Sequence, residues 1–234
     1  MIEVLFCDGT WSRPGARSPV GEALRKALDP RRVKFTYVDY AADYGPATGA
    51  ADLSYEESVA EGVAALEAAV VASPYFVVVA GYSQGAVVAL RYVRDVLPRR
   101  PKQIVLALAT LGDPHQEEHN GRSGIAGALA VSIRSFRRFV PGDPIADLGD
   151  GSPLRRVADL TAWMSVRSPE SVRTWATQTA QKLRTSRPWW NPFRWPDFAR
   201  AGEDIGNYLG TKHTTDYIQQ GHVAKLARDI ESVA

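Results

Sequence analysis

The stretch that decides the fold is Tyr75-Phe76-Val77-Val78-Val79-Ala80-Gly81-Tyr82-Ser83-Gln84-Gly85. Its first six residues form an apolar, β-branched run of the length of a buried strand. After it, apolar residues recur at helical spacing, at Ala86, Leu90, Val93 and Leu97. Between strand and helix stands the pattern Gly-x-Ser-x-Gly, and this order predicts a nucleophile elbow. Such a turn exposes the hydroxyl of Ser83 at the carboxyl edge of a sheet.

An elbow needs these residue types for steric and electrostatic reasons. The sharp turn forces Ser83 into a strained backbone conformation, and Gly81 and Gly85 remove Cβ atoms where the chain approaches itself most closely. The N–H of Gln84, at the start of the helix, is then placed to receive a negatively charged oxygen. A second donor is expected from the loop after the first strand, where Thr10 offers an amide and a hydroxyl.

The composition narrows the class of protein. The chain has 234 residues, 45% hydrophobic and 23% charged, which suits one soluble globular domain. A net charge of +2 gives no support for a nucleic-acid partner. The one cysteine, Cys7, excludes an intrachain disulfide, and it is expected to be a small buried residue. No stretch reaches the apolar length of a membrane span, and no secretory signal is recognisable.

Short apolar strands alternate with helices along the first two thirds of the chain. This alternation predicts the α/β class, with a central, mostly parallel sheet that helices flank. The functional loops should then follow Cys7, Ala80, Ala109 and Val140, at the carboxyl ends of strands. The expected strands are Ile2–Cys7, Val33–Tyr40, Tyr75–Ala80, Gln103–Ala109 and Ser135–Val140, and the expected early helices are Val20–Leu28, a helix capped by the box Ser54-x-x-Glu57, and the one after the elbow.

The pattern changes in the last third. Residues 154–164 and 171–183 have a helical pattern, and no strand is expected between about 153 and 210. We interpret this region as an α-helical insert within a single domain that spans residues 1–234. A closing helix is expected over 214–233.

An alkyl hydroxyl is a poor nucleophile without a base, and the base should be a histidine that a carboxylate orients. In this fold class the chain order is Ser, then acid, then His. His213 is favoured because it lies in a loop before the closing helix, whereas His222 lies within that helix. Asp143 is favoured over Asp113 because it stands in the last strand-end turn before the insert; Asp113 would otherwise cap its own turn.

A competing pattern is His115-Gln116-Glu117-Glu118-His119, which matches the zinc-protease pattern H-x-x-E-H. A zinc site would need a helix here, to place both histidines on one face. The neighbouring residues, Asp113-Pro114 and Asn120-Gly121, are typical of a loop. No metal and no cofactor are therefore expected.

With Gly81-Tyr82-Ser83-Gln84-Gly85, Phe6-Cys7-Asp8-Gly9-Thr10 and the Gly-Asp-Pro turns, the sequence resembles the cutinase-like serine esterases. Within them it is most similar to the lysin B esterases of mycobacteriophages. The helical insert, the lack of cutinase-type disulfides and the lack of a signal peptide support the narrower resemblance. It implies an α/β-hydrolase with Ser83 as nucleophile, Asp143 as acid and His213 as base.

The resemblance also implies a substrate and a place of action. The substrate would be the ester between mycolic acids and arabinogalactan, or another lipid ester, hydrolysed at the host envelope during lysis. The protein would be a monomer, made in the host cytoplasm and released through phage-made membrane holes. The alternatives are a general cutinase-like lipid esterase or lipase, and an inactive wall-binding protein with the same fold.

The insert contains a cluster of aromatic residues between residues 189 and 198. One interpretation is that these rings form the insert's own small core. The other is that some stay exposed and line a route for a long acyl chain, with Arg187 and Arg194 contacting an anionic envelope. The candidate substrate-binding residues are Trp189, Trp190 and Trp195, and Phe193 and Phe198 lie among them.

Overall fold

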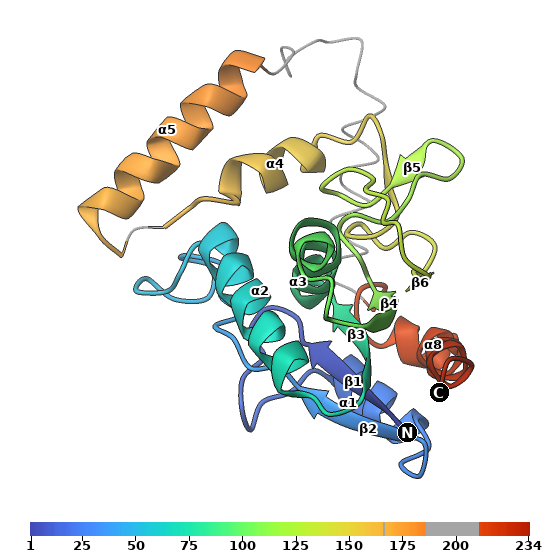
Figure 1. Ribbon diagram of the computed structural model, residues 1–234. Helices are drawn as coiled ribbons and strands as arrows, with labels where there is room; N and C mark the ends of the chain where they lie inside the picture. The colour runs from blue at the N-terminus through green and yellow to red at the C-terminus, as the bar shows by residue number, and fades with distance from the viewer. Residues whose placement is uncertain (166, 186–210) are drawn as a thin grey trace.

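The computed structural model describes residues 1–165, 167–185 and 211–234 (Figure 1). Its centre is a five-stranded sheet in the order β2-β1-β3-β4-β6, and every neighbouring pair of strands is parallel. Helices cover the sheet on both faces, so the expected α/β class with a parallel sheet is confirmed. The strands are β1 (Ile2–Cys7), β2 (Val33–Tyr37), β3 (Phe76–Tyr82), β4 (Val105–Leu111) and β6 (Ser135–Arg138).

The remaining elements surround this sheet. A short antiparallel pair, β5 (Arg122–Ser123) with β7 (Leu148–Gly149), lies in the loops beyond it. A π-helical turn, Tyr92–Val96, and a 3₁₀ turn, Leu97–Arg99, extend α3. The α-helices are α1 (Pro19–Ala27), α2 (Tyr55–Ala72), α3 (Gln84–Arg91), α4 (Leu154–Thr161), α5 (Pro169–Thr185), α7 (Asp216–Gln219) and α8 (His222–Glu231).

Alternate residues of each strand face opposite layers of the core, as the period of a strand requires. On one face, Phe6 and Val78 pack with Leu24 of α1 and Leu226 of α8. The residues next to them point to the other face, where α2 and α3 supply the partners, such as Leu66, Val87 and Val88. The central strands β1, β3 and β4 are covered on both faces, which explains why they are mostly apolar. The edge strands β2 and β6 are less buried and include polar residues.

Two helix boundaries show how local sequence sets the ends. The side chain of Ser54 accepts from the N–H of Glu57, and the carboxylate of Glu57 accepts from the N–H of Ser54, so the expected capping box is present. The closing helix, however, is not continuous. Gly221 adopts a φ of +75° and separates α7 from α8, because a left-handed residue ends one helix before the next begins.

The described part of the insert contains α4 and α5, close together at the end of the molecule far from β1 and β2 (Figure 1). The hydroxyl of Tyr44 lies 2.8 Å from that of Thr161, and the Glu56 N–H donates to the carbonyl of Ala162. These contacts hold α4 against the start of α2. Residues 186–210 lie outside the description, so the extent of the insert, about 153–210, stays a prediction. None of the described helices combines the length and apolar character that crossing a membrane requires.

Candidate active site

The elbow has the geometry that its steric pattern requires. Ser83 joins β3 to α3 with φ 55° and ψ −121°, a conformation that costs free energy for any residue with a Cβ atom. A Cβ atom on Gly81 would stand 2.1 Å from the carbonyl oxygen of Gly85, and one on Gly85 would stand 2.0 Å from that of Cys7. Both glycines are therefore required for β3, β1 and α3 to approach each other so closely.

Three side chains from distant parts of the chain meet at the carboxyl end of the sheet. His213 Nε2 lies 2.9 Å from Ser83 Oγ. On the other side of the ring, His213 Nδ1 lies 2.9 Å and 3.0 Å from the two carboxylate oxygens of Asp143. With Nδ1 donating to the carboxylate, Nε2 is left to accept the serine proton. Asp143 and His213 are both buried, so water does not compete for these bonds.

Asp113 lies in the equivalent turn of the neighbouring strand but has different partners. It accepts from the N–H of His115 at 2.8 Å, and its other oxygen lies 3.6 Å from the guanidinium of Arg137. Burial raises the pKa of this carboxyl above its ordinary value, although the arginine opposes the shift. Asp113 thus caps its own turn and pairs with a buried arginine, while Asp143 contacts the histidine.

His222, the alternative base, is the first residue of α8 rather than part of a longer helix. Its ring packs edge-on against that of Tyr217, with the centroids 6.0 Å apart. Partial burial, and then nearby Lys225 and Arg138, lower the pKa of His222. Its contacts are those of a helix-packing residue.

Two tyrosines that the sequence did not single out complete the site. Tyr217 donates from its hydroxyl to Asp143 Oδ2 at 2.5 Å, and its buried ring stands edge-on to that of His213. Tyr82 stacks on the His213 ring, with centroids 5.3 Å apart, and donates to the His213 carbonyl oxygen. The sequence held one signal for each tyrosine. Tyr82 occupies the first variable position of Gly-x-Ser-x-Gly, and Tyr217 follows His213 by four residues.

Of the two expected oxyanion donors, Gln84 belongs to the elbow and Thr10 lies in the loop after β1. Gln84 is the first residue of α3, so its N–H belongs to the turn that lacks intrahelical acceptors. The hydroxyl of Thr10 donates to the side-chain oxygen of Gln84 at 3.3 Å, which leaves the Thr10 amide as its available donor. The Gln84 side chain also donates to the carbonyl of Asp43. Gly9 lies against Tyr82 and Ser83, so the loop after β1 borders the nucleophile.

The segment His115–His119 is a loop, as its composition predicted. His115 Nδ1 lies 2.8 Å from the carbonyl of Gly127, and His119 Nε2 lies 3.0 Å from Asp147. The two histidines thus have separate partners. Across residues 1–165, 167–185 and 211–234, no group of histidine, cysteine and carboxylate side chains is placed to hold a metal ion. The candidate substrate residues Trp189, Trp190 and Trp195 lie outside the described residues.

Replacing Tyr217 with phenylalanine should move the pH dependence of ester hydrolysis to higher pH. Burial, and then the charge of Asp143, raise the pKa of Tyr217 well above its ordinary value, so its hydroxyl remains a donor at working pH. That bond draws charge from the carboxylate that stabilises a protonated His213. Without it, the imidazole should hold its proton to higher pH, and turnover near neutral pH should fall roughly tenfold.

The measurement is kcat/KM from pH 5 to 9 for the wild type and Tyr217→Phe. Tyr37→Phe is the matched control, because Tyr37 also donates to a carboxylate, that of Glu22, but lies on β2 away from the site. A uniform loss at every pH, with no displacement of the profile, would mean that Tyr217 only supports packing.

Comparisons with known proteins agree on the fold. A family model described as the PE-PPE domain matches residues 31–137, less than half of the chain. Lysin B from Mycobacteriophage D29 superposes with a TM-score of 0.58 at 19% identity, over 96% of this chain and 98% of that one. The catalytic core of acetyl xylan esterase from Trichoderma reesei superposes with a TM-score of 0.48 at 17% identity, over 79% of this chain and 98% of that one. A cutinase-like protein from Cryptococcus sp. superposes with a TM-score of 0.44 at 16% identity, over 80% of this chain and 97% of that one. Among curated proteins, none matches this sequence.

Proposed function

We propose that this chain is a serine carboxylic-ester hydrolase that forms an acyl-enzyme on Ser83. The observation that carries the proposal is the continuous chain of contacts from Ser83 Oγ through His213 to Asp143, with distances of 2.9 Å at both steps. A serine hydroxyl in strained backbone, hydrogen-bonded to a histidine that a buried carboxylate orients, is the arrangement that activates an otherwise weak nucleophile.

The geometry supports a two-step reaction. Ser83 Oγ attacks the ester carbonyl carbon while its proton passes to His213 Nε2, and Asp143 stabilises the resulting imidazolium. The N–H groups of Gln84 and Thr10 would stabilise the oxyanion of the tetrahedral intermediate. Collapse expels the alcohol, which takes the proton from His213, and leaves an acyl group on Ser83. Water, deprotonated by His213, then attacks this acyl group and releases the carboxylic acid and the free serine.

The substrate we propose is the ester between mycolic acids and arabinogalactan, hydrolysed at the bacterial envelope during phage lysis. The support is the likeness to lysin B from Mycobacteriophage D29, which extends over nearly the full length of both chains. The protein would act as a monomer at the envelope surface, after synthesis in the host cytoplasm.

Reaction with a fluorophosphonate probe tests the chemistry, and a set of esters tests the substrate. We expect rapid labelling of the wild type that is absent in Ser83→Ala, hydrolysis of short and long p-nitrophenyl esters, and release of mycolic acid from isolated mycolyl-arabinogalactan. Hydrolysis of the chromogenic esters without mycolic acid release would favour a general lipid esterase or lipase. A folded protein that the probe does not label would favour an inactive wall-binding protein.

Substitutions in the aromatic segment should separate long substrates from short ones. Changing Trp190 or Trp195 to serine should leave turnover of a short ester nearly unchanged, because the Ser83 site is untouched. The same change should lower activity on a long-chain or mycolyl ester roughly tenfold or more, because remote binding energy helps to orient the reacting carbonyl. The measurement is the ratio of the two activities, with thermal melts as the folding control.

If the ratio stays constant across Trp190→Ser and Trp195→Ser, or if activity on both esters falls in step with the melting temperature, the rings belong to the core of the insert.

A further inference from the structure

Exposed apolar side chains gather at one place far from Ser83. Among the described residues, eight large hydrophobic side chains are exposed, and five of them line a single groove of about 750 Å³. They include Phe76 and Ile104, each with more than half of its surface in water (56% and 58%). Exposed apolar residues scattered singly need no explanation, but a contiguous group usually marks a contact site. The five are Met1, Val71, Tyr75, Phe76 and Ile104.

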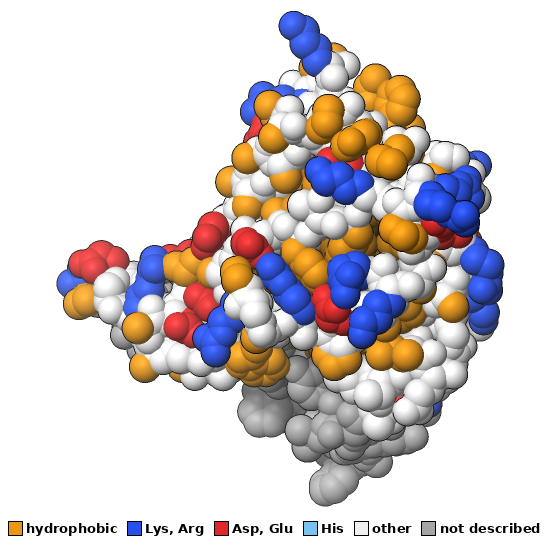
Figure 2. Space-filling model, turned by 90° about the horizontal axis from the view of Figure 1, so that it is seen from below, with side chains coloured by type: hydrophobic (Ala, Val, Ile, Leu, Met, Phe, Trp, Pro, Cys, Tyr) orange, Lys and Arg blue, Asp and Glu red, His pale blue; other side chains and the backbone are white. Residues whose placement is uncertain are grey.

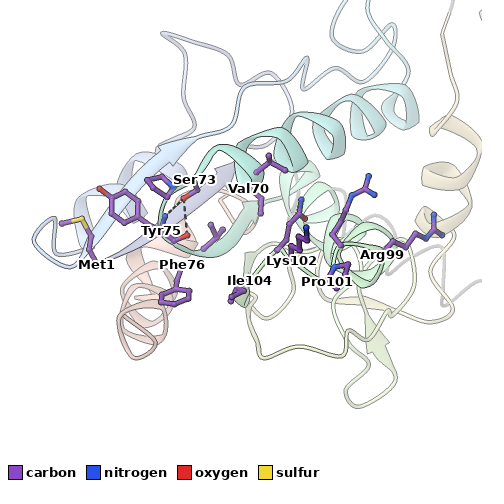
Figure 3. A pocket seen from close by; sticks show the side chains of 14 residues that line it. Met1, Val70, Ser73, Tyr75, Phe76, Arg99, Pro101, Lys102 and Ile104 are labelled. Atoms are coloured by element: carbon purple, nitrogen blue, oxygen red, sulfur yellow. Dashed lines mark hydrogen bonds between the residues drawn. The ribbon is translucent and has the colours of Figure 1, made fainter.

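The groove lies at the opposite end of the sheet from the candidate active site. Phe76 begins β3, while Ser83 follows the last residue of that strand. Seven residues of extended chain separate the two places by about 20 Å. Figure 3 shows Met1, Tyr75 and Phe76 along one side, Arg99, Pro101 and Lys102 along the other, and Ile104 between them. The groove therefore cannot be the acyl-binding part of the Ser83 site.

The walls are held by hydrogen bonds and do not depend on an occupant. On one side, Ser73 Oγ accepts from the N–H of Tyr75 at 3.2 Å and donates to Glu3 Oε2 at 2.5 Å. On the other side, Arg100 donates its N–H to the carbonyl of Leu97, and Gln103 donates to that of Arg100, both at 2.9 Å. A preformed concave site of this volume is in the range that binds small molecules.

The charge on the rim has one sign. Arg99, Arg100 and Lys102 line the groove, and none of its described lining residues is acidic. Arg100 is paired with Glu67 at 2.5 Å. Among the described residues, Lys102 forms no ion pair, and the charge of Arg99 acts on Asp95 without a direct ion pair. The end of the molecule at the bottom of Figure 1 shows hydrophobic side chains among lysines, arginines and some acidic residues (Figure 2). An excess of positive charge beside an apolar channel favours an anionic partner.

We infer that this groove binds a long-chain fatty acid anion, with its alkyl chain along Phe76 and Ile104 and its carboxylate between Arg99 and Lys102. A polar anion would leave the apolar walls in water, and a neutral alkane would leave the excess positive charge of the rim unmatched. A second copy of this chain would bring two basic rims together, which opposes self-association. The inference does not depend on the esterase proposal, because the groove lacks contact with Ser83 and its neighbours.

The test uses Ser83→Ala protein, so that neither acylation nor turnover interferes, and palmitate below its aggregation concentration, measured by isothermal titration calorimetry. We expect saturable binding that Lys102→Glu and Ile104→Asp each weaken at least tenfold. Val172→Asp is the matched control, because Val172 is an exposed apolar residue on α5 and outside the groove. Its affinity for palmitate should equal that of the parent. Thermal melts should agree among the variants, since all three side chains are exposed or on loops.

Four other outcomes would overturn the inference. Equal binding of dodecyltrimethylammonium would mean that the apolar walls adsorb any amphiphile regardless of charge. Binding to phosphatidylglycerol vesicles without binding to monomeric palmitate would make the groove a docking surface for a bilayer. A dimer in analytical ultracentrifugation that Ile104→Asp abolishes would assign the groove to contact between two copies. Unchanged palmitate affinity in both groove variants would place the bound anion elsewhere.

Discussion

Ser83→Ala protein should fold as the wild type does and lose about 10⁴-fold or more of its kcat on any ester, the scale seen when the nucleophile of a serine hydrolase is removed. The reason is that Ser83 Oγ forms the covalent bond that divides the reaction into two steps, and no neighbouring group can replace it. The residual rate should be the contribution of the oxyanion donors and of substrate binding alone. The measurement is kcat on p-nitrophenyl butyrate, with active-site titration of the wild type.

Folding is the necessary control for this variant, because Ser83 stands at φ 55° in the turn between β3 and α3. Alanine has the same Cβ atom as serine, so the backbone strain is unchanged and the melting temperature should shift by no more than a few degrees. Ser12→Ala is a matched substitution, since Ser12 is another buried serine on the neighbouring loop. Wild-type turnover in a Ser83→Ala preparation free of other esterases would refute the assignment of the nucleophile.

The elbow was predictable because its requirements are local. A strand, a glycine-flanked serine and a helix follow each other directly in the sequence, so the chain must turn sharply at Ser83. The steric reason for the glycines is that a Cβ atom at Gly81 or Gly85 would clash with the neighbouring backbone. The parallel sheet was predictable for a similar reason, because the central strands β1, β3 and β4 are short, mostly apolar runs. Strand ends were less well predicted: β2 ends at Tyr37 rather than Tyr40, and β4 begins at Val105 and runs to Leu111.

Features that depend on distant contacts were not predictable from the sequence. Tyr217 is buried against Asp143 only because α7 folds back over the turn after β6, and a tyrosine in a helix carries no mark of that role. The break at Gly221 was missed because one glycine within a helical pattern is often tolerated. The hydrogen bond from the Thr10 hydroxyl to the side-chain oxygen of Gln84 was not foreseen either, because it joins residues far apart in the chain.

The choice between the two Gly-Asp-Pro turns was left to chain order, and the structure supplies a physical criterion. Both aspartates follow a strand and a glycine with positive φ, at Gly112 and Gly142. Asp113 faces the buried Arg137, which β6 contributes, while Asp143 faces His213 and Tyr217. The sequence around the two turns does not differ in a way that predicts these partners, because both sets come from elsewhere in the chain.

His213→Ala should lower kcat by roughly 10⁴-fold or more, while His222→Ala should keep most of the activity. His213 Nε2 lies 2.9 Å from Ser83 Oγ and is the only described base in hydrogen-bond contact with it, whereas His222 packs on the ring of Tyr217. Activity of the wild type should rise with pH, because only the neutral imidazole accepts the serine proton. The measurement is kcat on a short ester for both variants, together with the pH profile of the wild type.

The same experiment distinguishes the two aspartates, because one substitution should lower activity and the other should lower stability. Asp143→Asn should lower kcat about 10⁴-fold with the fold intact, because an amide neither fixes the His213 tautomer nor stabilises its charged form. Asp113→Asn should keep the turnover of folded protein but lose roughly 3 kcal/mol of stability, because it leaves the buried charge of Arg137 with only the exposed Glu117, at 3.9 Å, as its counter-ion. Thermal melts and kcat on the same samples separate the two losses. If Asp113→Asn is inactive and Asp143→Asn retains activity, the orienting acid belongs to the turn after β4. If His222→Ala is the inactive variant, the base belongs to α8.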